Sequence, residues 1–373
     1  MDKYLPINLE KKEFLYKKIS SINQNEIKDI LKPFFTADID KECSNLYEDK
    51  WKLCQNECYR KLSKVVMKEI QSTIYYLRVL YFSILSFSKE KIEFTINTSS
   101  PFTGLWSTDS KNIELLIHSN DVKKELIFGF GPSASGKTFH VKNIISILRN
   151  ISPDFPSTFI SIDGGIYREY SVIYQIIIKE MEAHFTGIKN LSLPSIYTTI
   201  HYYNLIFPTD SIKKNIINFL MNQKSSYNLY VPETLGGCGE KRIESCQKKI
   251  DKFIKITKNK NWIGLCIWQH KYHIDCNFIS KYKCRGCHES GKEREIVEGK
   301  MYSNSSWLHS YKEGIKFMLK APSYRFFLHN SGTRNRKSIL VDYSKEPILT
   351  EKNIKNKSIK VVPKKCIELK IQK

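Results

Sequence analysis

One segment of the chain has the residue types and spacing of a phosphate-binding loop. The segment from Gly131 to Thr138, GPSASGKT, matches the pattern G-x-x-x-x-G-K-[ST] at every fixed position. An apolar stretch at 125–130 precedes it and a helical pattern follows. Glycines let backbone N–H groups converge on one point, and the N-terminus of the helix adds partial positive charge there. The sequence therefore predicts an ATP or GTP site, with Lys137 on the β- and γ-phosphates and Thr138 on Mg²⁺. The expected nucleotide contacts are Gly131, Ser133, Ala134, Ser135, Gly136, Lys137 and Thr138.

A carboxylate follows the next apolar strand candidate. Residues 158–162 end directly before Asp163, and Arg168 lies a short distance further on. Residues just past the carboxyl ends of parallel strands line the ligand crevice. Asp163 is therefore predicted to accept a proton from an attacking hydroxyl, and Arg168 to hold an anionic group of the acceptor. The alternative is that Asp163 caps the following helix, since Asp is a favoured N-cap, and the two roles are compatible.

A second carboxylate follows a third strand candidate. Residues 229–231 lead into Pro232, Glu233 and Thr234. Glu233 suits Mg²⁺ through water or an acceptor hydroxyl, with Thr234 beside it in the substrate site. The alternative is a surface turn residue. The strand candidate at 262–268 ends in Gln and His rather than in an acid, which disfavours a motor-type ATPase.

A highly charged segment at 281–300 has the composition of a lid. Arg285, Lys292 and Arg294 are candidates to close over the γ-phosphate. The alternative is a solvated helix face, because four glutamates nearly balance the cations. Cys284 and Cys287 within this segment predict either a structural Zn²⁺ site or reduced thiols, since no second pair at standard spacing is present.

The segment at 324–337 mixes aromatic and basic residues. Such a mixture suits stacking on bases and contact with phosphates. The plainer interpretation is the last core strand, which turns at Ser331 and Gly332 and lets Arg334 stack on adenine.

The balance of charge points to anionic partners. The formal net charge is +22, which favours nucleic acid or phosphorylated ligands, although the lysines are spread over the whole chain and also fit a compositional bias. No stretch of about 18 uncharged apolar residues is present, so no membrane span is expected. The apolar run at 74–87 is interrupted by Arg78 and suits a buried or interfacial helix. We expect a soluble, intracellular protein, cytoplasmic by default.

The pattern along the chain changes in three places. Residues 1–92 read as a helical N-terminal extension, and a Ser/Thr/Pro/Gly-rich stretch marks 93–107 as a linker. From 108 to 345 short apolar strands alternate with helices, which predicts an α/β domain with a parallel sheet flanked by helices. Residues 346–373 form a basic tail, expected to be solvated. The strand candidates are 126–130, 158–162, 229–231, 262–268 and 324–328.

Four features together resemble the zeta toxin family of P-loop kinases, over roughly residues 120–345. They are the loop GPSASGKT, the strand end at Asp163 with Arg168 nearby, the strand end at Pro232, Glu233 and Thr234, and the arginine-bearing lid. The resemblance implies a P-loop kinase core. Bacterial members use ATP and Mg²⁺ to phosphorylate a sugar hydroxyl of UDP-N-acetylglucosamine. The roles it implies are Lys137 and Thr138 as phosphate and Mg²⁺ contacts, Asp163 as general base, Arg168 as acceptor contact, and Arg285 and Arg294 as lid arginines. The N-terminal extension, an insert at about 185–225 and the cysteine-bearing lid depart from compact bacterial members, and the loop also resembles that of uridine kinases.

The sequence therefore predicts a Mg²⁺-ATP-dependent kinase that transfers the γ-phosphoryl group to a hydroxyl of a small, nucleotide-like acceptor, with a UDP-sugar as one candidate. Two alternatives stay open. A polynucleotide or RNA kinase is favoured by the net charge and the basic tail. A non-catalytic nucleotide-binding module would bind ATP without turnover.

Overall fold

The computed structural model describes fourteen stretches of the chain. They are 25–30, 57–70, 73–86, 93–98, 113–118, 124–131, 135, 137–185, 209–233, 243–260, 262–269, 325–330, 338–342 and 367–369.

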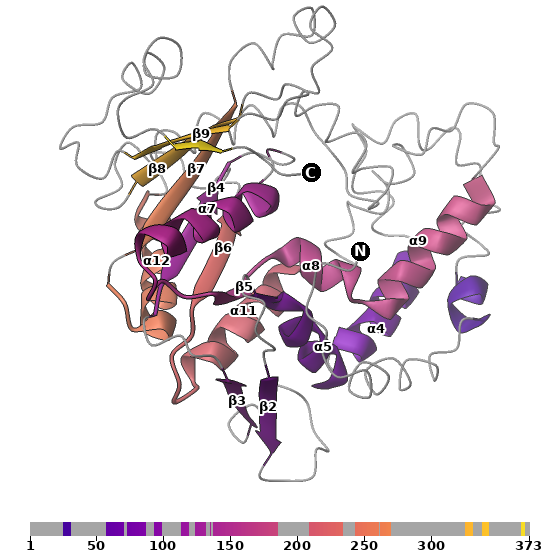
Figure 1. Ribbon diagram of the computed structural model, residues 1–373. Helices are drawn as coiled ribbons and strands as arrows, with labels where there is room; N and C mark the ends of the chain where they lie inside the picture. The colour runs from indigo at the N-terminus through magenta and orange to yellow at the C-terminus, as the bar shows by residue number, and fades with distance from the viewer. Residues whose placement is uncertain are drawn as a thin grey trace, which may run out of the picture.

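These residues fold around an 8-stranded mixed sheet of order β1-β5-β6-β4-β7-β8-β9-β10 (Figure 1). The members from β5 to β8 run parallel to one another. They are β4 (Leu126–Phe130), β5 (Thr158–Ser161), β6 (Leu229–Glu233), β7 (Ile263–Gln269) and β8 (Arg325–Asn330). The strand candidates of the sequence coincide with these parallel strands within a few residues, which confirms the α/β class.

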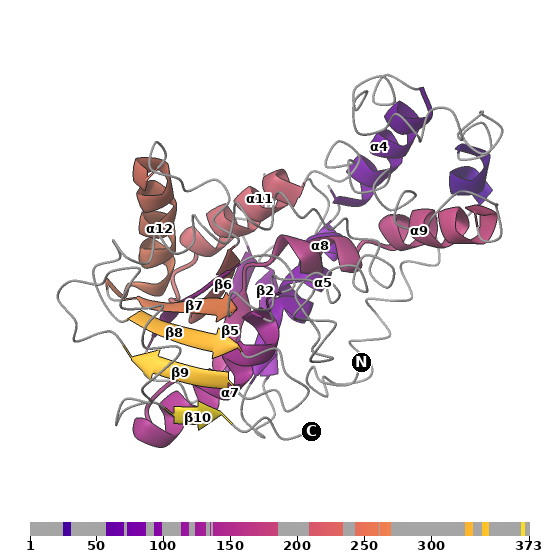
Figure 2. The ribbon, with the colours of Figure 1, turned by 90° about the horizontal axis from the view of Figure 1, so that it is seen from above.

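Helices cover both faces of the sheet. On one face, Ile127 of β4 packs against Val141 and Ile144 of α7 (Lys137–Ile151). On the other, the ring of Phe128 meets Phe253 of α12 (Ile243–Thr257) edge to face, with ring centroids 5.7 Å apart. Neighbouring residues of a strand point to opposite faces, so α7 and α12 lie on opposite sides of β4. α11 (Thr209–Met221) packs beside α12 (Figure 2).

The region expected as an N-terminal extension contributes to the main sheet. Helices α4 (Glu57–Ile70) and α5 (Thr73–Ser83) agree with the helical pattern, but α5 leads directly into β1 (Ile84–Ser86). β1 pairs antiparallel with β5 at the edge of the sheet. The sequence assigned this end of the apolar run to a helix, because a short apolar run does not distinguish a strand from a buried helix.

The expected linker and tail also contain strands. β2 (Glu93–Thr98) lies in the range assigned to the linker and pairs antiparallel with β3 (Ile113–His118). β9 (Ser338–Asp342) and β10 (Ile367–Leu369) extend the sheet antiparallel beyond β8, so the tail supplies an edge strand. The division into domains at residues 92 and 345 stays a prediction. Within the described residues, no helix has the length and apolarity needed to cross a membrane.

Candidate functional site

The candidate site lies at the carboxyl edge of β4, β5 and β6. Parallel strands end at the same edge of a sheet, so the residues after them lie close together. Gly131 follows β4, and its N–H donates to the carbonyl oxygen of Glu233 at the end of β6, at 3.2 Å. Asp163 follows β5, which pairs with β6 on its other side. The edge therefore brings together the start of the predicted loop and both predicted carboxylates.

Lys137 begins α7 and folds back onto the strand end. Its ammonium donates to the carbonyl oxygen of Gly131 at 2.8 Å. Gly131 has φ 156°, a conformation that residues with a side chain rarely adopt. Ser135 is 1% exposed, and its hydroxyl has no hydrogen-bond partner among the described residues. A half-buried ammonium together with a buried hydroxyl that lacks a partner among the described residues suits an anionic ligand.

Asp163 caps the short helix that follows it. Its Oδ1 accepts a hydrogen bond from the N–H of Gly165 at 2.9 Å, at the start of α8 (Gly164–Glu169). The capping role considered from sequence is therefore confirmed. The bond uses one of the two carboxylate oxygens. Arg168 lies in the last turn of α8 and is half-buried.

Glu233 is bound by two lysines that sequence reasoning missed. The ammonium groups of Lys213 on α11 and Lys249 on α12 each lie 2.6 Å from its Oε1. The side chain of Glu233 is 17% exposed, so the surface-turn alternative is wrong. Burial raises the pKa of Glu233, but the charges of the two lysines and their hydrogen bonds outweigh burial and hold this pKa below its ordinary value of 4.5.

Tyr167 of α8 was also missed by the sequence analysis. Its side chain is fully buried, and its hydroxyl has no hydrogen-bond partner within the described part of the chain. Burial raises the pKa of Tyr167 well above its ordinary value, and the negative charges of Asp163 and Glu233 raise it further. No local pattern in the sequence distinguishes this tyrosine from the others.

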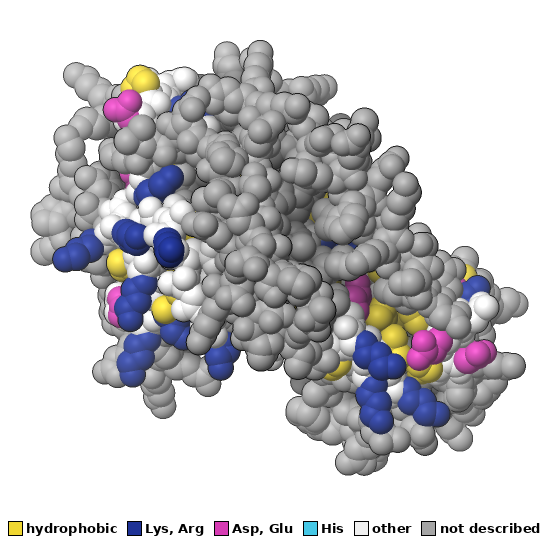
Figure 3. Space-filling view, turned by 90° about the horizontal axis from the view of Figure 1, so that it is seen from below, with side chains coloured by type: hydrophobic (Ala, Val, Ile, Leu, Met, Phe, Trp, Pro, Cys, Tyr) yellow, Lys and Arg dark blue, Asp and Glu magenta, His cyan; other side chains and the backbone are white. Residues whose placement is uncertain are grey.

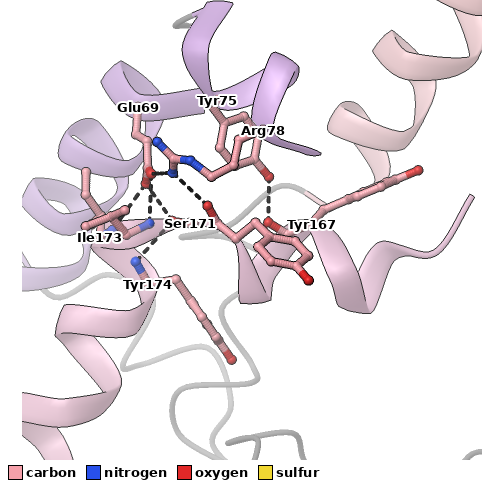
Figure 4. Close-up of polar contacts among 9 residues, drawn as sticks. Glu69, Tyr75, Arg78, Tyr167, Ser171, Ile173 and Tyr174 are labelled. Atoms are coloured by element: carbon pink, nitrogen blue, oxygen red, sulfur yellow. Dashed lines mark hydrogen bonds and ion pairs between the residues drawn. The ribbon is translucent and has the colours of Figure 1, made fainter. Parts of the chain in front are cut away.

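A buried carboxylate from α4 holds the start of the helix that follows α8 (Figure 4). Helix α9 runs over Val172–Phe185. Glu69 accepts hydrogen bonds from the hydroxyl of Ser171 at 2.5 Å and from the N–H groups of Val172 at 2.8 Å and Ile173 at 3.3 Å. These are the first amides of α9, which have no partner inside the helix, and a negative charge there is favoured by the helix dipole.

Two side chains of α5 hold the end of α8 (Figure 4). Arg78 donates to the carbonyl oxygen of Tyr170 at 2.8 Å and lies 3.3 Å from a carboxylate oxygen of Glu69. The hydroxyl of Tyr75 donates to the carbonyl oxygen of Tyr167 at 2.7 Å. A helix as short as α8 is not stable alone. Its position beside the site therefore depends on Asp163 at one end and on α4 and α5 at the other.

The remaining predicted site residues lie outside what the structure describes. They are Ser133, Ala134, Gly136, Thr234, Arg285, Arg294, Arg334 and the cysteines Cys284 and Cys287. For Thr138 the backbone is described, in the first turn of α7, but not the side chain. Among the described residues, no group of three or more His, Cys, Asp and Glu is placed to hold a metal ion. The roles of these residues and the zinc site stay predictions.

Together these features define an α/β protein with a charged site at the carboxyl edge of its parallel strands. No protein-family model matches the sequence, and a search of curated proteins finds no match. A solved structure from the PezAT chromosomal toxin–antitoxin system of Streptococcus pneumoniae is similar to this chain at 13% identity. The similarity covers 63% of this chain and 77% of that chain, with a TM-score of 0.26. The relation is distant and transfers no residue role to this chain.

Proposed function

We propose that this protein is a Mg²⁺-ATP-dependent kinase of the zeta toxin type, which transfers the γ-phosphoryl group to a hydroxyl of a small, nucleotide-like acceptor. A UDP-sugar is one candidate acceptor. The observation that carries the proposal is the meeting of Lys137, Asp163 and Glu233 at one edge of a parallel sheet. The motif GPSASGKT between β4 and α7 supports it, because strand, loop and helix follow one another as a phosphate loop requires.

In such a reaction each residue at the edge would have a separate role. Lys137 would leave the carbonyl of Gly131 and contact the β- and γ-phosphates, with the hydroxyl of Ser135 as a further donor. Asp163 would accept the proton of the attacking hydroxyl with the oxygen that does not cap α8. Arg168 would hold an anionic part of the acceptor.

Mg²⁺ would neutralise charge on the phosphates, and the described contacts limit which residues could hold it. Glu233 already contacts two ammonium groups. Their positive charges repel Mg²⁺, which disfavours Glu233 as a direct metal ligand. The hydroxyl of Thr138 is the group that would hold the ion, as the loop motif implies. Catalysis would then rest on positioning and on charge stabilisation.

A label-transfer experiment tests the proposal. Protein is incubated with γ-labelled ATP, Mg²⁺ and a panel of metabolites and oligonucleotides, and the parent is compared with Lys137→Ala and Asp163→Asn. We expect Lys137→Ala to lose MgATP binding while its circular dichroism spectrum is unchanged. We expect Asp163→Asn to bind MgATP and cap α8 but to lose transfer. Equal MgATP affinity in Lys137→Ala and the parent would refute nucleotide binding at the loop. Binding without transfer to any acceptor would favour the non-catalytic module.

An RNA or polynucleotide acceptor is the second candidate, and α12 is the observation that favours it. Its outer surface and the turn after it carry a row of exposed lysines, and Figure 3 shows Lys and Arg side chains gathered on the described part of one face. The row consists of Lys248, Lys252, Lys255, Lys258 and Lys260. Binding of an oligonucleotide through these lysines would weaken steeply with salt. Label transfer to an oligonucleotide and not to metabolites would favour this candidate.

A further inference from the structure

The lysine pair on Glu233 has an unbalanced charge. Lys213 and Lys249 both contact the same oxygen, Oε1, so their ammonium groups lie close together and repel each other. Among the side chains that the structure describes, Glu233 is the one carboxylate in contact with them, and it neutralises one of the two charges. The cluster therefore carries a net positive charge in a place where Lys213 and Glu233 are only 14% and 17% exposed. Partly buried charge of this kind is stabilised when an anion completes the cluster.

The lysine pair lies where β4 and β6 end, next to the predicted phosphate loop. Glu233 is paired in register with Phe130, one residue before Gly131, and accepts a hydrogen bond from the Gly131 N–H. The ammonium of Lys137 is bound to the carbonyl oxygen of the same glycine. Three ammonium groups thus surround the short stretch where β4 and β6 end. Lys249 is 42% exposed, so its side chain can turn from Glu233 toward a ligand.

The helices that supply the pair place it on the acceptor side of the loop. Phe130 and Phe128 belong to the same face of β4, and Phe128 packs against α12. Glu233, in register with Phe130, lies on that face as well, which is how lysines of α11 and α12 reach it. α11, which carries Lys213, also packs against α8, the helix that Asp163 caps. The pair therefore lies on the side of the edge where Asp163 would activate an acceptor.

We propose that Lys213 and Lys249, oriented by Glu233, form a phosphate subsite next to the loop, which binds a phosphate group of a substrate. This inference rests on the proposed function. The phosphate can come from two sources with the same chemistry, the γ-phosphate of ATP or a phosphate of the acceptor. When it binds, Lys249 exchanges part of its contact with Glu233 for phosphate oxygens, and Lys213 keeps the carboxylate in place.

Ligand affinity measured by isothermal titration calorimetry tests the subsite. The probes are MgATP, MgADP and UDP-N-acetylglucosamine, and the variants are Lys213→Met and Lys249→Met. The matched controls are Lys214→Met and Lys248→Met, which remove the exposed lysines next in the chain. We expect Lys249→Met to weaken at least one probe by about tenfold, as for the loss of one charge-assisted contact. The controls should change each affinity by less than about twofold.

The pattern over the probes identifies the source of the phosphate. Weaker binding of MgATP with unchanged binding of MgADP would assign the subsite to the γ-phosphate. Weaker binding of UDP-N-acetylglucosamine alone would assign it to a phosphate of the acceptor. The salt dependence of the affected affinity should also become shallower in Lys249→Met, which a purely structural effect would not produce. Melting temperatures of the variants without ligand show whether a lost affinity reflects unfolding. If Lys213→Met does not fold, Lys249→Met still tests the subsite, because the Lys249 side chain is 42% exposed and its replacement should disturb the fold less.

The subsite is overturned if both variants bind all three probes like the controls. That outcome differs from failure of the proposed function, which shows as unchanged MgATP affinity in Lys137→Ala. If Lys137→Ala loses MgATP and the lysine variants do not, the loop binds nucleotide and the pair serves only to neutralise Glu233.

Discussion

The buried pair of Glu69 and Arg78 should be a main source of stability for the region beside the site. Their side chains are 4% and 5% exposed, with 3.3 Å between the guanidinium and the carboxylate. Removing one partner of a buried pair leaves an uncompensated charge and costs about 3–5 kcal/mol. Arg78→Met should fall at the lower end, about 3 kcal/mol, because Glu69 keeps its three hydrogen bonds at the start of α9. Glu69→Ala should reach the upper end, about 5 kcal/mol, because those donors lose their acceptor as well.

Urea unfolding followed by circular dichroism measures these free energies. For a chain of 373 residues with an unfolding entropy of about 2.1 cal/mol/K per residue, 3 kcal/mol corresponds to a fall in Tm of about 4 °C. The control is Lys28→Met, which removes a partner of Glu180 in an ion pair whose side chains are 51% and 26% exposed. An exposed pair of this kind contributes about 0–1 kcal/mol. A double-mutant cycle between Glu69→Ala and Arg78→Met should give a coupling of about 1–3 kcal/mol.

The result that would contradict this reasoning is an Arg78→Met variant as stable as Lys28→Met, or a cycle with no coupling. Either would mean that the carboxylate and the guanidinium are solvated independently in solution. Hydrogen exchange adds a local readout. Because Arg78 bonds the carbonyl of Tyr170, its loss should speed exchange in α8 and at the start of α9 more than in α7.

Three further predictions concern the edge itself. Gly129→Ala should destabilise by about 1–3 kcal/mol, because a Cβ there would lie 2.7 Å from the hydroxyl oxygen of the buried Tyr230, and Tyr230→Phe should recover part of the loss in urea unfolding. Asp163→Ala should lower unfolding free energy by about 1 kcal/mol through loss of the cap, whereas Asp163→Asn should keep most of it. The lowered pKa of Glu233 means that its ion pairs stabilise fully above about pH 4.5 and that this contribution disappears as pH falls below it; Lys213→Met should move that loss to higher pH in denaturation curves.

The parallel core could be predicted because its signals are local. Buried parallel strands are continuous apolar runs, and β4, β5 and β6 are each short runs between turn or helix signals. Asp163 and Glu233 could be placed at strand ends because Asp163 directly follows such a run and Glu233 follows one after Pro232. The antiparallel strands β1 and β10 were missed, since three residues carry too little periodicity to mark a strand.

The partners of the acids could not be predicted because they come from distant parts of the chain. Lys213 is one of 60 Lys and Arg residues, and no local pattern marks it as the partner of Glu233. The hydroxyl of Ser171 reaches Glu69 across 102 positions of sequence. Only the order of strands in the sheet places α4, α5, α11 and α12 beside the end of β5 and β6. The sequence shows that such residues are charged, but only the fold determines which partner each of them contacts.

The lysines of α12 fall into two groups, one in contact with Glu233 and one exposed on the surface. On α12, Lys249 turns to Glu233 at the edge, while Lys248 and Lys252 stay exposed. If the charge were a footprint for nucleic acid, removing any of these lysines would weaken oligonucleotide binding by a similar amount, since phosphate contacts along a polyanion are nearly interchangeable. If the charge serves a small phosphorylated substrate, removing Lys249 should weaken binding more than removing Lys248 or Lys252, because Lys249 is the one of these three that contacts Glu233 at the edge. The two explanations therefore differ in which lysine of α12 affects binding, Lys249 beside Glu233 or its exposed neighbours Lys248 and Lys252.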